Sequence, residues 1–403
     1  MEKAKHARKM RKNKRIYITS AAILVIALLL IITLTRGGKK KVPDDPFGGV
    51  TDEISSVETE PSEPGEKRAG AIYFSSLNKR EQSLYDAILK AARDVSEKTE
   101  TLEGTFTSQR FEDIVNFVLA DNPDLFYVAF GKLVLQDGGD KCYVDMKYCV
   151  DTEKIPDMKA ELAAALTAAV TDGDFLLVES DAEKELALHD MLIAKCGAPE
   201  GDDPLFNTAY GALVMNEAYC DGYAYAMKLM LSRAGIEAYT VYGNANDADH
   251  AWNLVKIGGE YYHLDVLWDD ANLSFPVNME FHGYFNLSDK AISRDHTMTY
   301  PDLVPDASGE EDFYSLTGRK GKTLADMTAI FNKEIAAAVE EKREYIEVYC
   351  EETAESEALG EKLIPCIEAY NAEHGGVLID LCHVYPASAV SNAVTVQLFY
   401  AEN

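Results

Sequence analysis

The sequence contains no CxxC pair and no cysteine–histidine spacing of the zinc-finger type. These absences argue against a small zinc-binding module, and we expect no metal and no other cofactor. The seven cysteines are an odd number, so at least one thiol stays free in any intramolecular pairing. We expect Cys220 to be a free thiol, whereas spacing alone does not determine disulfide pairing among the other six, Cys142, Cys149, Cys196, Cys350, Cys366 and Cys382.

Basic residues are scarce beyond the first 36 positions. The chain of 403 residues has 39 basic and 68 acidic residues, a net charge of −29. Residues 1–36 hold nine of the basic residues and one acidic residue, so the remainder carries a net charge of −37. Such a surface repels nucleic acid and anionic lipid, and we expect no nucleic-acid partner. A preference for basic or amine-bearing substrates is a weaker interpretation of the same charge.

Charged residues are also absent from residues 16–35, a twenty-residue run rich in Ile and Leu. The run is long enough to cross a bilayer. Eight basic residues precede it in residues 1–15 and four follow it closely. This asymmetry predicts a single-pass protein of the cell membrane, with a basic cytoplasmic tail and the bulk of the chain outside the cytoplasm. A cleaved signal peptide is the alternative, but no small-residue cleavage site is evident; a lipoprotein anchor is excluded because no cysteine precedes Cys142.

The remaining chain divides by composition into a linker and three folded parts. Residues 36–70 are rich in Gly, Pro, Ser, Glu and Asp and predict a disordered tether. Residues 71–175 predict an N-terminal α/β extension that begins with an Asn78–Glu81 capping box and includes a strand at 125–128. Residues 176–305 form the expected core, and residues 310–403 predict a small C-terminal α/β domain in which Pro365 should kink or divide a helix.

Cys220 lies at the start of a predicted helix. Apolar residues recur at helical spacing from Asp221 to Arg233, and Gly235 stands where a left-handed C-cap is expected. The unpaired N–H groups and the dipole at a helix start favour a thiolate. The charge of Asp221 opposes that effect.

A histidine and an aspartate flank a predicted hairpin. Gly258-Gly259 is typical of a two-residue turn between strands at 250–257 and 260–267, with His250 delivered by a polar loop at 243–249. This turn pairs Trp252 with Asp265, so His250 and Asp265 become diagonal neighbours on one face, with Cα atoms about 7–8 Å apart. A slip of one residue would place them on opposite faces.

The chain thus supplies a nucleophile, a base and an orienting carboxylate in Cys220, His250 and Asp265. In such a triad the imidazole takes the thiol proton, the carboxylate fixes the tautomer, and nearby N–H groups receive the oxyanion. Each residue has a plainer interpretation, namely a small buried thiol, a packed strand histidine and a turn-forming aspartate. Their order and register together favour the catalytic one.

These segments resemble the core of the transglutaminase-like superfamily over roughly residues 180–300. The similar motifs are Cys220-Asp221-Gly222-Tyr223-Ala224, Ala234-Gly235-Ile236, His250-Ala251-Trp252-Asn253, Tyr262-His263-Leu264-Asp265-Val266 and Trp268-Asp269-Asp270, with Glu185-Leu186-Ala187-Leu188-His189-Asp190 upstream and Tyr284-Phe285-Asn286-Leu287-Ser288-Asp289 downstream. Leu267 departs from the bacterial pattern, which usually has Thr there. The resemblance implies an α+β, papain-like fold in which the helix carrying Cys220 packs on an antiparallel sheet, and a Cys–His–Asp triad that performs acyl transfer.

Other histidines and tryptophans near these motifs are weaker candidates for a role in the chemistry. Cys220, His250, His263 and Asp265 can be drawn as a zinc site, but the lack of compact ligand spacing disfavours it. His189 is expected to be a helix-packing residue. Trp252 and Trp268 are expected to wall the cleft. Residues 321–323 imitate the end of a phosphate-binding loop, but Leu316 occupies the position of its first glycine. We therefore interpret residues 318–321 as a turn that leads into a helix.

The sequence therefore predicts a membrane-anchored thiol enzyme whose substrate is a protein or peptide of the cell surface or wall. A Cys220 thioester would be resolved by water or by an amine, and we favour water slightly. The superfamily includes cross-linkers, peptidases and deglycosylating enzymes, so the resemblance does not choose the acceptor. The alternatives are a catalytically silent binding or scaffold protein, or a protein whose C-terminal domain is the main binding module; the oligomeric state is not predicted.

Overall fold

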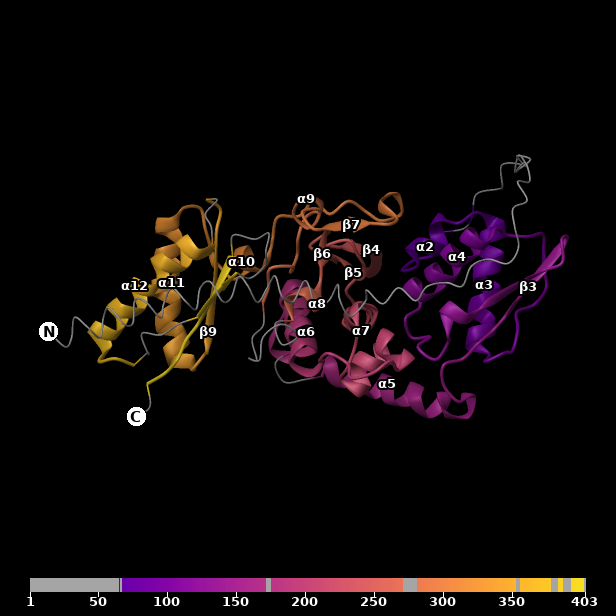
Figure 1. Ribbon diagram of the computed structural model, residues 1–403, viewed down its shortest axis with the longest axis horizontal. Coiled ribbons are helices and arrows are strands. Elements are labelled where there is room, and N and C mark those ends of the chain that lie inside the picture. Colours follow the sequence, from indigo (N-terminus) through magenta and orange to yellow (C-terminus); the bar gives the residue numbers. More distant parts are fainter. Residues whose placement is uncertain are drawn as a thin grey trace, which may run out of the picture.

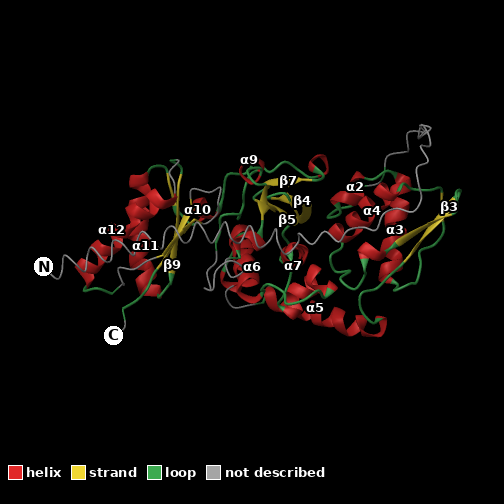
Figure 2. Cartoon of the chain, viewed as in Figure 1, coloured by secondary structure: helices red, strands yellow, loops and turns green. Residues whose placement is uncertain are grey.

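The computed structural model describes residues 65, 67–171, 175–270, 281–352, 356–377, 383–386 and 393–401. Three regions follow one another along the long axis of the molecule, and each combines helices with strands (Figures 1 and 2). None of the helices in these ranges is both long enough and apolar enough for a membrane span. The predicted transmembrane run, residues 16–35, and most of the predicted linker lie outside the described residues.

The central region is a four-stranded antiparallel sheet with the strand order β6-β5-β4-β7. Its strands are β4 (Ala238–Ala245), β5 (Ala248–Ile257), β6 (Glu260–Leu264) and β7 (His296–Met298). The helix α7 (Cys220–Arg233) packs against β4 and β5, and α5 (Ile155–Ala169) and α6 (Asp181–Lys195) pack against α7. This mixed α+β arrangement, with a helix on an antiparallel sheet, confirms the predicted fold class.

The helix α7 begins with Cys220 and ends where glycine was expected to stop it. Tyr219 is its N-cap, and Gly235 follows the C-cap Ala234 with φ +82°. The inner face of α7 buries Met227 and Leu231 against the sheet. Each such side chain stabilises the fold by roughly 1.5–3 kcal/mol. This packing fixes the helix start, and therefore Cys220, against the strands that carry His250.

The β5–β6 hairpin has the predicted register. Gly258 and Gly259 both have positive φ, and the ladder runs from Ile257–Glu260 to Asn253–Leu264. It stops there because Asp265 leaves the strand and becomes the N-cap of α8 (Val266–Asp269), accepting a hydrogen bond from the Trp268 N–H. The predicted continuation of this strand to residue 267 is therefore wrong.

The segment before His250 also differs from the expectation of a long polar loop. The strands β4 and β5 continue through most of residues 243–249, and Asn246 and Asp247 alone connect them, with φ of 46° and 64°. Both residue types tolerate the left-handed conformation that a two-residue hairpin turn needs. His250 thus lies within β5 and is not its first residue.

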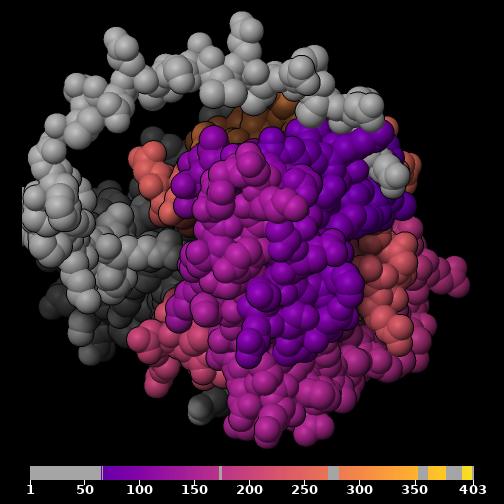
Figure 3. All heavy atoms as spheres, turned by 90° about the vertical axis from the view of Figure 1, so that its right-hand side faces the viewer, coloured from indigo at the N-terminus to yellow at the C-terminus, as the bar shows by residue number. Residues whose placement is uncertain are grey.

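The N-terminal region packs three helices with a small sheet of order β1-β3-β2. The predicted capping box is present, with Asn78 and Glu81 at the start of the second of these helices. Residues 125–128 form turns and not the predicted strand; Val128 contributes a single bridge to Tyr148. The elements are α2 (Ile72–Ser76), α3 (Lys79–Arg93), α4 (Ser108–Asp121), β1 (Leu102–Glu103), β2 (Val134–Asp137) and β3 (Lys141–Asp145). Seen from this end, atoms coloured indigo to magenta cover most of the visible face (Figure 3).

The C-terminal region has a sheet of order β10-β11-β9-β8, in which only β8 and β9 are parallel among the described strands. The helix predicted from about residue 323 is present as α11, with Thr323 as its N-cap. The turn predicted at 318–321 is wrong in its second half, because Lys320–Gly321 form β8. The helix α12 continues through Pro365 and is not divided. The elements are α10 (Phe313–Leu316), β8 (Lys320–Gly321), α11 (Leu324–Glu341), β9 (Tyr345–Cys350), α12 (Ser356–His374), β10 (His383–Pro386) and β11 (Ala393–Gln397). The six cysteines within the described residues are free: Cys142, Cys149, Cys196, Cys220, Cys350 and Cys366.

Candidate active site

Cys220 occupies the first turn of α7 and is partly exposed. The backbone N–H groups of that turn have no acceptor within the helix. Close packing fixes the turn, because a Cβ added to Gly222 would lie 2.8 Å from the Phe206 carbonyl oxygen and 2.7 Å from the Ala218 Cβ. The helix start can therefore hold a thiol and unpaired donors together in one place.

His250 and Asp265 form a buried pair. The distance from His250 Nε2 to Asp265 Oδ2 is 2.5 Å, and both side chains are at most 5% exposed. Burial alone would lower the pKa of His250, but the Asp265 carboxylate raises it to about 10. Burial would likewise raise the pKa of Asp265, but His250 and His296 hold it well below its usual range.

Cys220 and His250 line the same cavity, and the thiol is one of the groups that raise the pKa of the His250 ring. Because Asp265 occupies Nε2, the nitrogen left to face the thiol is Nδ1. The three residues singled out in the sequence are thus together in the order thiol, imidazole, carboxylate. An imidazolium in this position stabilises a thiolate, which is the reactive form of cysteine.

A cavity of 610 Å³ opens at this site, with Cys220 and His250 in its wall. The core supplies part of its lining, including Tyr225 and Tyr242, and the N-terminal region supplies Phe126 and Phe130 among others. Its charged lining residues are Lys132, Asp221 and Asp249. The N-terminal extension therefore forms one side of the cleft into which the thiol faces.

His296 is a residue of the site that the sequence did not reveal. Its Nε2 lies 3.1 Å from Asp265 Oδ2, and its Nδ1 lies 2.6 Å from Asp295 Oδ1. Asp265 therefore accepts from two imidazoles, His250 and His296. The hydrogen bonds to the two carboxylates raise the pKa of His296 against the lowering effect of its burial. The signal in the sequence was weak, because His296 follows His250 by 46 positions and lies on another strand.

Three comparisons with known proteins bear on this geometry. Residues 169–266 match the family model described as the transglutaminase-like superfamily. This segment is a transglutaminase-like core. No curated protein sequence matches the chain.

Solved structures that match the chain include a TGase, with 12% identity and a TM-score of 0.25, covering 33% of this chain and 43% of that one. A candidate cysteine protease from Cytophaga hutchinsonii has 18% identity and a TM-score of 0.23, covering 31% and 51%. A candidate protease from Parabacteroides distasonis has 14% identity and a TM-score of 0.21, covering 34% and 35%. The match thus spans about half or less of each of these structures.

The tryptophans of the transglutaminase-like core lie behind the triad and not in the cleft wall. Neither is among the residues that line the cavity. Trp252 is 1% exposed and donates from Nε1 to His263 Nδ1 at 2.9 Å, while the ring centroid of Trp268 lies 6.0 Å from that of His250. His263 in turn pairs through Nε2 with Asp289 at 2.8 Å. His263 is therefore engaged away from Cys220, so the structure does not assemble the zinc set drawn from the sequence.

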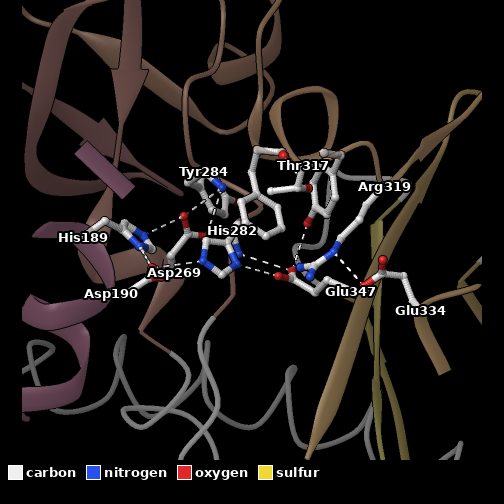
Figure 4. A network of polar contacts seen from close by, with 11 residues as sticks. His189, Asp190, Asp269, His282, Tyr284, Thr317, Arg319, Glu334 and Glu347 are labelled. Atoms are coloured by element: carbon white, nitrogen blue, oxygen red, sulfur yellow. Dashed lines mark hydrogen bonds and ion pairs between the residues drawn. The ribbon is translucent and has the colours of Figure 1, made fainter. Parts of the chain in front are cut away.

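His189 was expected to be a helix-packing residue, but it also contacts carboxylates and a second imidazole. It lies fully buried on α6, where its ring faces Asp190, Asp269 and the ring of His282. His282 continues this network to Glu347 on β9 of the C-terminal region (Figure 4). No motif in the sequence indicated the pairing of His282 with Glu347, which stand 65 positions apart.

Proposed function

We propose that this protein is a membrane-anchored, extracytoplasmic thiol enzyme that transfers an acyl group from a protein or peptide carboxamide, through a Cys220 thioester, to water or to an amine. The observation that supports it most is the alignment of a partly exposed thiol, an imidazole and a buried carboxylate at the wall of an open cavity. The transglutaminase-like core agrees with this chemistry.

In the first half of the reaction His250 Nδ1 holds the proton of Cys220, and the Cys220 thiolate attacks the carboxamide carbon. The backbone N–H of Cys220, at the helix start, donates to the oxyanion of the tetrahedral intermediate. The C–N bond then breaks, the departing amine or ammonia takes the proton from His250, and a thioester remains. Asp265 keeps the ring of His250 oriented and stabilises its charge throughout.

In the second half His250 removes a proton from the acceptor, which attacks the thioester carbon. The C–S bond breaks and the Cys220 thiolate returns, with the imidazolium beside it. Water yields a carboxylic acid, whereas a primary amine yields a new amide. We favour water as the acceptor, because the cavity opens to solvent and water is present there at high concentration.

The test uses a mixture of amide-bearing surface peptides, with and without a fluorescent primary amine, and reads the products by mass spectrometry. Wild-type protein is expected to give free acids, identified by ¹⁸O uptake from labelled water, and to carry a thioester on Cys220 after rapid acid quench. Cys220→Ala should give neither. An inert wild type that nonetheless retains the same peptides as Cys220→Ala would instead support the alternative of a catalytically silent binding protein.

The proposed membrane anchor rests on residues 16–35 and their flanking basic residues alone. Full-length protein is expected to sediment with membranes and to resist high-salt and carbonate extraction, whereas a chain starting at residue 65 should remain soluble. Release of the full-length protein by salt would contradict the anchor and would leave the proposed chemistry untouched.

A further inference from the structure

A second cluster of histidines and carboxylates lies apart from the triad, where the transglutaminase-like core meets the C-terminal region (Figure 4). His189 and Asp190 come from α6, Asp269 from the end of α8, and Glu347 from β9. His282, two residues before Tyr284, lies between them. Four of these five side chains are buried, while the Asp190 side chain is 36% exposed.

Three atoms of this cluster converge on one point. His189 Nδ1 lies 2.8 Å and His282 Nε2 lies 3.1 Å from Asp190 Oδ1, and the three atoms lie within 4.8 Å of one another. Ligands placed tetrahedrally around Zn²⁺ at about 2.0–2.1 Å are roughly 3.3 Å apart. Small side-chain shifts would therefore convert this hydrogen-bonded triangle into one face of a metal site.

The opposite nitrogen of each imidazole already faces a carboxylate. His189 Nε2 lies 3.4 Å from Asp269 Oδ2, and His282 Nδ1 lies 2.6 Å from Glu347 Oε2. Asp269 is held by the Tyr284 N–H at 2.9 Å. Histidines that bind metals usually donate their other N–H to a carboxylate, which fixes the tautomer and raises the basicity of the ligating nitrogen. His282 has that support from Glu347, whereas His189 Nε2 faces Asp269 without a hydrogen bond among the described residues.

The charges of the cluster also suit a dication. Asp190, Asp269 and Glu347 bring three carboxylates together, and in the described part of the chain no lysine or arginine pairs with any of them. Buried charge without compensation is costly. A divalent ion between two neutral imidazoles would supply two positive charges, as would protonation of both rings.

The triad shows a related triangle, His250, Asp265 and His296, but differs in two respects. Asp265 is 1% exposed, and its second oxygen accepts a hydrogen bond from the Trp268 N–H. In addition, the other nitrogen of His250 faces the Cys220 thiol. Asp190, by contrast, is reached by solvent. The exposed part of the Asp190 side chain gives an ion in solution access to this carboxylate.

We propose that His189 Nδ1, Asp190 Oδ1 and His282 Nε2 bind one divalent transition-metal ion, such as Zn²⁺, with water as a further ligand. The ion joins α6 to the segment that contacts β9, and so fastens the C-terminal region to the core. It is a structural site apart from the triad and takes no part in the acyl transfer, so the proposed function does not depend on it.

Isothermal titration of the chelator-treated full-length protein with Zn²⁺ tests the site. The Cys220→Ala background is used, because a free thiolate could itself bind zinc. We expect one ion per chain with a Kd of about 10 µM or tighter, and a raised melting temperature. Asp190→Asn and His282→Gln should each weaken binding at least about 100-fold, and Glu347→Gln about 10- to 100-fold. His263→Gln, a buried histidine outside the cluster, should leave binding unchanged.

Co²⁺ provides a readout that needs no further variant. One equivalent should give the visible d–d bands of a four- or five-coordinate site with nitrogen and oxygen ligands, and Zn²⁺ should displace them. The proposal is overturned by an absence of stoichiometric binding of either ion at 1 mM or below, by octahedral spectra typical of loosely held aqueous ions, or by binding that survives in folded Asp190→Asn and His282→Gln.

Discussion

At the scale of single residues, Asp265 does more than orient one histidine. It accepts from His250 at 2.5 Å and from His296 at 3.1 Å through the same oxygen, while its other oxygen caps α8. A carboxylate held by three donors cannot rotate away when His250 changes its charge. His296 therefore extends the group to four side chains: it contacts Asp265 and is not among the residues that line the cavity.

His296→Asn tests this positioning role. Loss of a hydrogen bond to a charged group costs about 1.5–3 kcal/mol, so we expect acylation of Cys220 by an amide substrate to slow about 10- to 100-fold. The melting temperature should fall by a similar amount in His296→Asn and His263→Asn, because both substitutions remove a buried, hydrogen-bonded imidazole. His263→Asn is the matched control, because His263 is also buried but does not contact Asp265. Equal effects of the two substitutions on the acylation rate would contradict the role given to His296.

Lys228 lies on α7, the helix that begins with Cys220, and burial lowers its pKa. It is 6% exposed on α7, and its Nζ donates to the Ala120 carbonyl oxygen of α4. Burial lowers the pKa of Lys228 to about 8, against the raising effect of Asp121 and Asp124. Because the folded pKa lies below the unfolded value of about 10.4, the folded state pays a cost below pH 8 that disappears as the pH rises through this interval.

The free energy of unfolding of wild type relative to Lys228→Met should therefore increase by roughly 2–3 kcal/mol between pH 7 and pH 10.5. Urea unfolding at both pH values measures it. Other titrating groups largely cancel in the difference between the two proteins. A difference that stays flat with pH would mean that Lys228 is solvated in the folded protein.

At the scale of elements, the start of α7 is the most constrained point of the site. Gly222 has buried backbone atoms on two sides, the Phe206 and Thr208 carbonyl oxygens, at 2.8 and 3.0 Å from an added Cβ. Those atoms belong to the segment that precedes α7 in the chain and cannot move as a flexible side chain can. The position of Cys220 depends on this close approach.

Gly222→Ala should lower the free energy of unfolding by about 1–3 kcal/mol and should also slow the alkylation of Cys220, since the helix start must shift. Gly197→Ala is the control, because no atom lies within 4 Å of its added Cβ. Chemical denaturation and thiol alkylation are measured on both. A Gly222→Ala protein with wild-type stability would contradict this, because it would show that the segment before α7 moves without cost to make room for the added methyl group.

The sequence revealed the elements whose signals are local. Gly258-Gly259 gave the register, Gly235 the helix end and Asn78 with Glu81 a helix start, because each turn or cap depends on a few neighbouring residues. The Asn246-Asp247 turn was missed because neither residue is glycine, although both adopt positive φ. Asp265 was assigned to a strand because the apolar residues after it fit a strand as well as the short helix α8.

Contacts between distant segments could not be predicted. The ring of His282 stacks on that of Phe313 with centroids 3.7 Å apart. Its Nδ1 also forms a hydrogen bond with the Glu347 carboxylate. Neither pairing leaves a pattern in a single sequence. Cys220, His250 and Asp265 were found because two of them share a hairpin and all three match a family motif. His296 was missed because it lies on another strand, outside that hairpin, and in none of the motifs.

At the scale of the whole molecule, the C-terminal region is integrated with the core. Phe313, Tyr314 and Ala393 belong to the same apolar cluster as Leu264 and Phe285 of the core. The polar contacts of His282 with Glu347 cross the same boundary. A C-terminal domain that acted only as an appended binding module would not need such a shared interior.

Removal of the C-terminal region should therefore destabilise the core. A chain of residues 65–309 is expected to melt roughly 5–10 °C or more below a chain of residues 65–401, because it loses several buried aromatic contacts. Calorimetry should show one cooperative transition for the longer chain. Two separate transitions, with the core transition unchanged by truncation, would contradict the shared interior.

The most direct test of the central claim is the rate at which iodoacetamide alkylates Cys220 as a function of pH, followed by peptide mass spectrometry. If His250 and Asp265 hold the thiol as a thiolate–imidazolium pair, Cys220 reacts rapidly at pH 6, and His250→Ala slows that reaction at least about tenfold. The buried Cys196 serves as an internal reference. An alkylation profile that is the same in wild type and His250→Ala would contradict the proposed active site.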